Sequence, residues 1–204
     1  MVMPTRIATD IQLLVEGNDG KNFFRHFCQH LSPTSIEVHD FGGINNFKCY
    51  LPAFVNISGF GNVTRLGIIR DAEDDAAAAF QSVQSVVKNA GLCPPDDVQT
   101  FSAGTPTVGV LILPGDKQSG MLETLLCQTF ADQPENSCID EFFRCLESQT
   151  NQSLKRPDKS RAHAFLSTTD YPQLSVGVAA QKGYWNLDHD AFIHVRDFLT
   201  KLAS

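Results

Sequence analysis

Four acidic side chains stand where an apolar segment gives way to a helical pattern. The apolar run Gly67–Ile69 leads through one arginine into Asp71 and Glu73, and Asp74 and Asp75 precede an alanine-rich segment. Residues two apart in an extended chain point to the same side, so we expect Asp71 and Glu73 to face one site. A divalent cation held by oxygen ligands would explain this charge beside a buried strand. Asp74 and Asp75 are placed to cap the following helix. The alternative for the whole group is ordinary helix-start chemistry, because Asp is favoured at helix N-termini.

A further acidic residue follows another apolar segment nearer the N-terminus. The run Ile11–Val15 ends at Glu16, and Gly17–Gly20 has the composition of a tight turn. If both apolar runs are strands of one parallel sheet, Glu16 and Asp71 lie at the same edge, where the carboxyl ends of the strands meet. Ligand sites of such sheets lie beyond this edge. The alternative for Glu16 is a turn residue on a solvated rim.

The rest of the chain alternates between apolar runs and helical patterns, which is typical of an α/β fold. The patterns predict strands at 11–15, 35–41, 66–69 and 108–113, a short strand at 98–101, and a strand or loop at 176–180. They predict helices at 20–31, 44–57, 76–90, 121–130, 139–146, 161–167 and 191–202, and a polar loop at 150–160. We therefore expect a mostly parallel sheet with helices on both faces, followed by an additional helical section.

Composition limits the classes of function. The chain has 204 residues, 42% of them hydrophobic and 19% charged, as in a folded globular domain with a proper core. A net charge of −7 means that binding to nucleic acid would need a local basic patch, a metal, or both. Six scattered cysteines without a Cys-x-x-Cys pair predict reduced core thiols. The sequence has no membrane-length apolar run and no targeting pattern, so we expect a cytoplasmic protein.

Several short motifs resemble the Toprim domain of topoisomerases, primases, recombination proteins and the overcoming-lysogenization-defect nucleases. The matching pattern is an apolar strand ending in Glu16-Gly17 with an Asp shortly after, followed by a later strand ending in Asp71-x-Glu73. Gly120–Leu126 and Gly183–His189 are similar to segments of a small bacterial family of Toprim-related proteins. The resemblance implies a single Toprim-like (Rossmann-like) domain over 1–204, with its core at about 10–115 and a helical elaboration at about 116–204.

The resemblance also implies roles for individual residues. Glu16 matches the Toprim glutamate that serves as metal ligand or general acid/base, and Asp71 matches a magnesium ligand. Glu73 stands where the family has a second Asp, and the longer side chain departs from the pattern. Glu123 resembles an acidic residue that helps to hold a second metal in the Toprim nucleases, although a first-turn helix acid is an equal alternative. The cofactor implied is Mg²⁺, with Mn²⁺ possible.

One segment concentrates positive charge, with Lys155, Arg156, Lys159 and Arg161 close together. We expect Lys159 and Arg161 to contact a nucleic-acid backbone or to stabilise charge opposite the metal, since they lead into an apolar helix. For Lys155 and Arg156 a solvated loop is the favoured interpretation. Lys182 is a further candidate cation. Tyr184 and Trp185 could stack on a base, but core positions are the commoner role.

Three functions remain open. The first is a magnesium-dependent nuclease-like enzyme acting on phosphodiester bonds. The second is a metal-binding or regulatory module that acts through a partner protein, which the departure at Glu73 and the acidic composition favour. The third is a small-molecule phosphohydrolase, which a narrow pocket would favour. His26 and His30 have helical spacing but lack a zincin motif, so we interpret them as surface residues.

Overall fold

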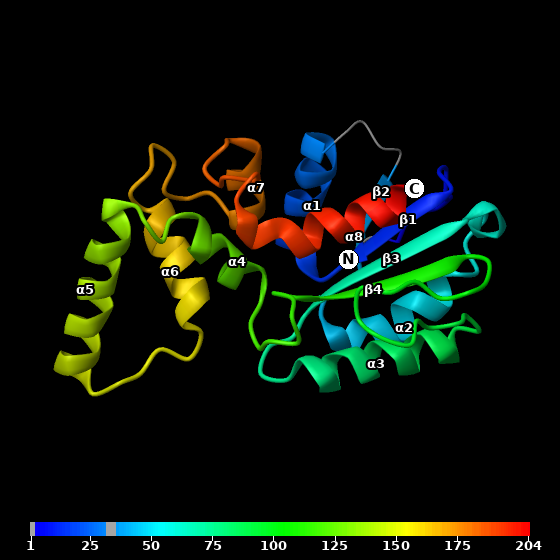
Figure 1. The fold of residues 1–204 in the computed structure, drawn as a ribbon, viewed down its shortest axis with the longest axis horizontal. Coiled ribbons are helices and arrows are strands. Elements are labelled where there is room, and N and C mark those ends of the chain that lie inside the picture. Colours follow the sequence, from blue (N-terminus) through cyan, green and yellow to red (C-terminus); the bar gives the residue numbers. More distant parts are fainter. Residues whose placement is uncertain (1–2, 32–35) are drawn as a thin grey trace.

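The computed structural model describes residues 3–31 and 36–204. They form an α/β fold in which a sheet of four parallel strands has helices on both faces (Figure 1). The strand order is β2-β1-β3-β4. The strands are β1 (Ile11–Val15), β2 (Ile36–Asp40), β3 (Arg65–Asp71) and β4 (Thr107–Leu113). The helices are α1 (Gly17–Leu31), α2 (Ile44–Phe54), α3 (Ala76–Asn89), α4 (Leu122–Thr129), α5 (Pro134–Thr150), α6 (Pro157–Leu166), α7 (Val176–Gln181) and α8 (Ile193–Ala203), with 3₁₀ turns at Phe60–Asn62 and Asp190–Phe192. This confirms the predicted fold class.

Strands β1 and β3 lie side by side at the point where the chain reverses the direction in which it adds strands. From β1 the chain crosses to β2 on one side, and it then returns to place β3 on the other. Val15 is paired with Ile69, so Glu16 and Arg70 follow at the same level. In an open α/β sheet this switch point opens a crevice at the carboxyl edge. The fold therefore provides a natural site between β1 and β3.

Alternating side chains of the strands bury the two faces of the sheet under different helices. Leu13 and Val15 of β1 belong to the core beneath α1 and α8, whereas Leu14 belongs to the core formed with α2 and α3. Figure 1 shows α1 and α8 on one face and α2 and α3 on the other. Because both faces are covered, most residues of the two central strands β1 and β3 and of β4 are buried, as expected for a parallel sheet, whereas the edge strand β2 carries Glu37, His39 and Asp40.

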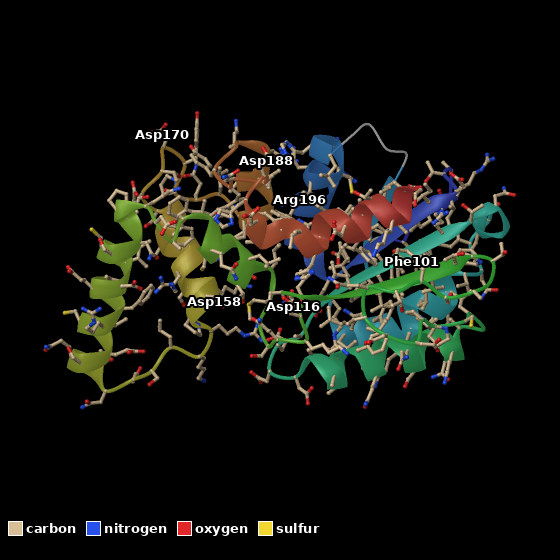
Figure 2. All side chains as sticks on the ribbon, viewed as in Figure 1. Phe101, Asp116, Asp158, Asp170, Asp188 and Arg196 are labelled. Atoms are coloured by element: carbon tan, nitrogen blue, oxygen red, sulfur yellow. The ribbon has the colours of Figure 1, made fainter. Side chains whose placement is uncertain are left out.

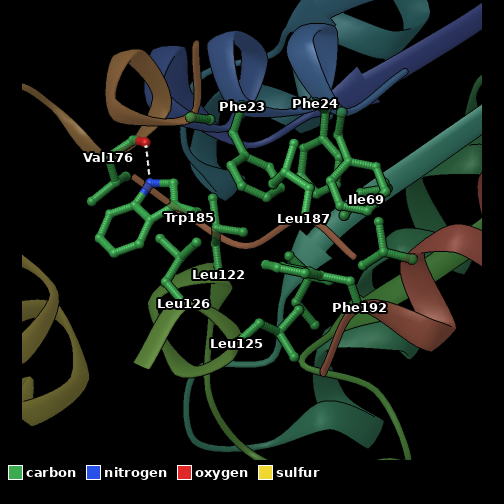
Figure 3. Close-up of a cluster of buried hydrophobic side chains, with 14 of the residues drawn as sticks. Phe23, Phe24, Ile69, Leu122, Leu125, Leu126, Val176, Trp185, Leu187 and Phe192 are labelled. Atoms are coloured by element: carbon green, nitrogen blue, oxygen red, sulfur yellow. Dashed lines mark hydrogen bonds between the residues drawn. The ribbon is translucent and has the colours of Figure 1, made fainter. Parts of the chain in front are cut away.

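Helices α4–α7 extend the core beyond the carboxyl edge of the sheet. In Figure 3, Leu122 and Leu126 of α4 and Trp185 lie in the same buried cluster as Phe23 of α1. The Trp185 indole Nε1–H donates to the carbonyl oxygen of Val176 at 2.8 Å, which satisfies the polar atom of this buried ring. The helical section is thus packed onto the sheet domain and has a fixed position at its edge.

Several sequence-based expectations about elements were wrong. Residues 98–101 form no strand in the described structure, where Phe101 makes one isolated bridge to Gly109. Residues 176–181 form helix α7, because packing against α1 overrides the weak strand preference of two valines. The loop predicted at 150–160 ends at Arg156, since Pro157 occupies the first turn of α6, where its missing N–H costs nothing.

The cysteines also differ from expectation. All six are free, but only Cys28 is buried, Cys127 is intermediate and the other four are exposed. Burial raises the pKa of the Cys28 thiol to about 12, which makes this thiol unreactive. Within the described residues, no helix has the length and apolar character needed to cross a membrane.

Candidate functional site

A cleft of about 380 Å³ opens at the carboxyl edge between β1 and β3. Its walls come from the end of β1, the first turn of α1, the end of β3, the start of α4 and the start of α6. The charged side chains that line it are Glu16, Asp19, Asp71, Glu73 and Glu123, with Arg70, Arg156 and Lys159. All four carboxylates predicted as site residues therefore lie in one cleft, although they come from separate parts of the chain.

Asp71 ends β3 and lies against the N-terminus of α4. The Leu122 backbone N–H donates to Asp71 Oδ1 at 3.0 Å, so the positive end of the helix faces this carboxylate. Burial, followed by repulsion from Glu123 and Glu16, nevertheless raises the pKa of Asp71 to about 8. The hydrogen bond from α4 offsets part of this effect. A cation in the cleft would relieve the repulsion.

Glu16 follows β1 immediately and is turned into the cleft by the chain reversal at Gly17. Gly17 has φ +76°, a left-handed conformation that glycine adopts without strain. Burial is the largest influence on Glu16 and raises its pKa, while Arg70 acts in the opposite direction. Glu16 Oε2 lies 3.9 Å from Arg70 Nε, and neither of these buried atoms has a hydrogen-bond partner among the described residues. An unsatisfied carboxylate oxygen in a cleft is suited to a cation or to a proton donor.

Glu73 does not continue the extended strand as the sequence pattern suggested. It has φ +52°, and its backbone forms two hydrogen bonds with Gly120, at 2.9 and 2.8 Å. This bridge holds the segment after β3 against the segment before α4. Arg156 Nη2 lies 3.6 Å from Glu73 Oε2. Asp75 next caps α3 by accepting from the Ala78 N–H at 2.9 Å, as predicted, while Asp74 is exposed.

Glu123 lies in the first turn of α4, and its side chain is 9% exposed. Lys159 Nζ lies 3.7 Å from Glu123 Oε1. The start of α6 is fixed to α4, because Thr124 Oγ1 donates to Asp158 Oδ2 at 2.6 Å and Cys127 Sγ donates to the Asp158 carbonyl oxygen at 3.3 Å. Figure 2 labels Asp158 at this end of α6. The two helices therefore place an acid and a cation on the same wall of the cleft.

The other predicted contacts lie elsewhere. Arg161 does not line the cleft; it pairs with Asp140 and donates to Asn136 Oδ1 at 2.7 Å, which ties α6 to α5. Its predicted role at the site is therefore not supported. Lys182 Nζ lies over the Tyr171 ring, 5.4 Å from its centroid. Trp185 is a core residue that is 2% exposed.

Arg70 and Asp19 line the cleft although neither was a candidate site residue from the sequence, and Arg156 was a weaker candidate than Lys159. Arg156 is a solvated residue of the loop before α6, as interpreted, with a side chain that is 57% exposed, and it also lines the cleft. The position of Arg156 next to Pro157 was the available signal, since Pro marks a helix start. Arg70 lies beside Asp71 in the sequence, and its Nη1 donates to the Ala79 carbonyl oxygen at 2.9 Å.

The four predicted ligands offer carboxylate oxygens, which are the donor atoms that a hard divalent cation such as Mg²⁺ prefers. The present side-chain positions do not form a closed site: in residues 3–31 and 36–204, no three His, Cys, Asp or Glu side chains are grouped so that they could hold a metal ion. Two of the four predicted ligands, Glu73 and Glu123, lie next to Arg156 and Lys159 instead. The remaining two, Glu16 and Asp71, have pKa values raised mainly by burial.

Comparison with known proteins gives one match. The family described as Protein of unknown function (DUF3226) matches residues 10–204, which is nearly the whole chain. The chain belongs to this DUF3226 family. The match includes both the sheet and the helical section, so the walls of the cleft all fall within the DUF3226 region. No curated protein matches the chain significantly. No solved structure does so either.

Proposed function

We propose that this DUF3226 protein is a Toprim-like, Mg²⁺-dependent enzyme that cleaves phosphodiester bonds of nucleic acid. The observation that carries the proposal is the arrangement of Glu16, Asp71, Glu73 and Glu123 around one cleft at the switch point of the sheet. Carboxylates at this edge are the ligands that Mg²⁺ prefers, and Mn²⁺ accepts the same donors. Three cations line the same cleft and suit an anionic substrate.

The chain's own residues have distinct tasks in this reaction. A bound metal would neutralise charge on the phosphate and activate a water. Asp71 and Glu73 are ligands in this scheme, with Glu123 as an additional one. Glu16 is a further metal ligand or accepts a proton, a task for which its raised pKa makes the carboxylate more basic than in water. Lys159 stabilises negative charge on the phosphate from the wall opposite the sheet.

The six free cysteines support a reducing compartment, and we place the activity in the cytoplasm. The acidic net charge of −7 means that affinity for nucleic acid must come from the cleft itself.

A regulatory module that binds metal without catalysis is the second candidate. It is favoured by the two ion pairs, Arg156 with Glu73 and Lys159 with Glu123, since these engage the cations that an enzyme would offer to its substrate. Such a module would act through a partner protein.

The deciding experiment is cleavage of single-stranded DNA, duplex DNA and RNA with Mg²⁺ or Mn²⁺. We expect metal-dependent cleavage by the wild type, lowered by a factor of about 100 or more in Asp71→Asn and Glu16→Gln. Asp74→Asn is the matched control, because it removes the same charge from an exposed neighbour. If the wild type and the two cleft variants have equal activity, the enzyme proposal fails. If the wild type binds metal but cleaves nothing, the regulatory module becomes the better account.

A further inference from the structure

Arg156 and Lys159 occupy neighbouring positions at the start of α6 and each faces a different acid of the cleft. Arg156 is the N-cap residue of α6 and Lys159 lies in the first turn of the helix, and both line the cleft. Their side chains are 57% and 47% exposed, so both remain in contact with solvent. The N···O separations of 3.6 and 3.7 Å are too long for hydrogen bonds. These contacts are therefore purely electrostatic and can be exchanged at small cost.

The position of α6 is nevertheless fixed. Asp158, between the two cations, is bound by the Thr124 hydroxyl at 2.6 Å and by the Cys127 thiol at 3.3 Å. Arg161, one turn further along the helix, is anchored to Asp140 and Asn136 of α5. The helix start cannot move away from the cleft without breaking these contacts. Only the exposed ends of Arg156 and Lys159 are free to change partner.

Binding of a divalent cation would change the ion pairs that Arg156 and Lys159 make in the cleft. Five acidic and three basic side chains line the cleft. When a divalent cation binds the carboxylates, Glu73 and Glu123 take it as their counter-ion, and Arg156 and Lys159 lose theirs. Two unpaired positive charges at the start of α6 then lie beside the bound cation. An anion with several oxygens is the ligand that such a pair attracts, and arginine in particular matches the geometry of phosphate.

We propose that Arg156 and Lys159 form a phosphate-binding site that becomes available when the cleft binds its metal, so that metal and phosphate bind cooperatively. This inference rests on the metal binding assumed in the proposed function. The carboxylates Glu73 and Glu123 hold the two cations in the metal-free protein, which lowers the affinity of that state for phosphate. Linkage requires the converse as well: phosphate must raise the affinity for metal by the same factor.

The test is calorimetric titration of the full chain with Mg²⁺, with and without millimolar inorganic phosphate. In the wild type we expect phosphate to raise the Mg²⁺ affinity by a factor of about 10, within the usual range of such couplings. In Arg156→Gln with Lys159→Gln, the factor should fall below about 2, while the Mg²⁺ affinity without phosphate should rise about three-fold because competing cations are gone. Circular dichroism confirms that the variants are folded.

Lys155→Gln is the control, because it removes one positive charge from the adjacent position, and Lys155 makes no ion pair with any described residue. It should keep the full coupling to phosphate. Coupling that persists in the double variant, or that is missing from the wild type although Mg²⁺ binds, overturns the inference and leaves the proposed function to the cleavage assay. A wild type that binds no Mg²⁺ overturns both. Coupling without any cleavage activity supports the inference and contradicts only the enzymatic proposal.

Discussion

Replacing Asp71 with Asn should stabilise the metal-free protein. The pKa of Asp71 is raised from 3.8 to about 8, so its folded state binds a proton more tightly than the unfolded chain does. Stability is therefore lost as the pH rises from 3.8 towards 8, because the unfolded chain releases this proton while burial, and then repulsion by Glu123 and Glu16, disfavour the ionised form in the folded protein. Asn removes this charge and can still accept the hydrogen bond from the Leu122 N–H.

The size of the stabilisation by Asp71→Asn follows from the raised pKa of Asp71. A pH of 7 lies about 3 units above the pKa of Asp71 in the unfolded chain and below its pKa of about 8 in the folded protein. The loss of folding free energy from this difference is at most about 4 kcal/mol. Asp71 is only partly shielded from solvent, so screening reduces this value and we expect a gain of about 2 kcal/mol. The gain should be about three times larger at pH 8 than at pH 5.

Urea unfolding in the presence of EDTA measures this difference. Asp74→Asn is the matched control and should change the free energy of unfolding by less than about 0.5 kcal/mol, because Asp74 is exposed. With Mg²⁺ added, the wild type should gain stability and Asp71→Asn should not. If Asp71→Asn is no more stable than the wild type at pH 8, neither burial nor repulsion by the other carboxylates disfavours the ionised form of Asp71 in the folded state, and the electrostatic description of the cleft is refuted.

Two further substitutions test the elements that position the site. Asp75→Ala should cost about 1 kcal/mol in urea unfolding, because Ala78 loses its N-cap acceptor at the start of α3, whereas Asp75→Asn keeps the acceptor and should be nearly neutral. Trp185→Phe should cost about 1–3 kcal/mol, because it leaves the buried Val176 carbonyl without its indole donor and opens space in the cluster; an unchanged unfolding midpoint would mean that the helical section adds little to the core.

The sheet and the acidic edge could be predicted from the sequence because their signals are local. Continuous apolar runs ending at Glu16 and Asp71 marked buried parallel strands, and the meeting of their carboxyl ends followed from topology. Asp74 and Asp75 were both predicted to cap the alanine-rich helix, and Asp75 is the residue that does so.

The wall formed by α6 could not be predicted in the same way. Its first turn is polar, so apolar periodicity begins too late to reveal the helix start at Pro157. Which of four nearby cations enters the cleft depends on the direction of the helix. That direction is set by the tertiary contact between Thr124 and Asp158, and it turns Arg161 towards α5. The φ of +52° at Glu73 likewise depends on the bridge to Gly120, which lies far away in the sequence.

Above all, we propose that the cleft binds a divalent cation through carboxylates that include Glu16 and Asp71. Titration with Mn²⁺, in which electron paramagnetic resonance detects the free ion, tests it most directly. We predict that the wild type removes Mn²⁺ from solution in competition with Mg²⁺, and that Asp71→Asn and Glu16→Gln do so at least about ten times more weakly, while Asp74→Asn binds as the wild type does. Equal binding by the wild type and both cleft variants would contradict the claim.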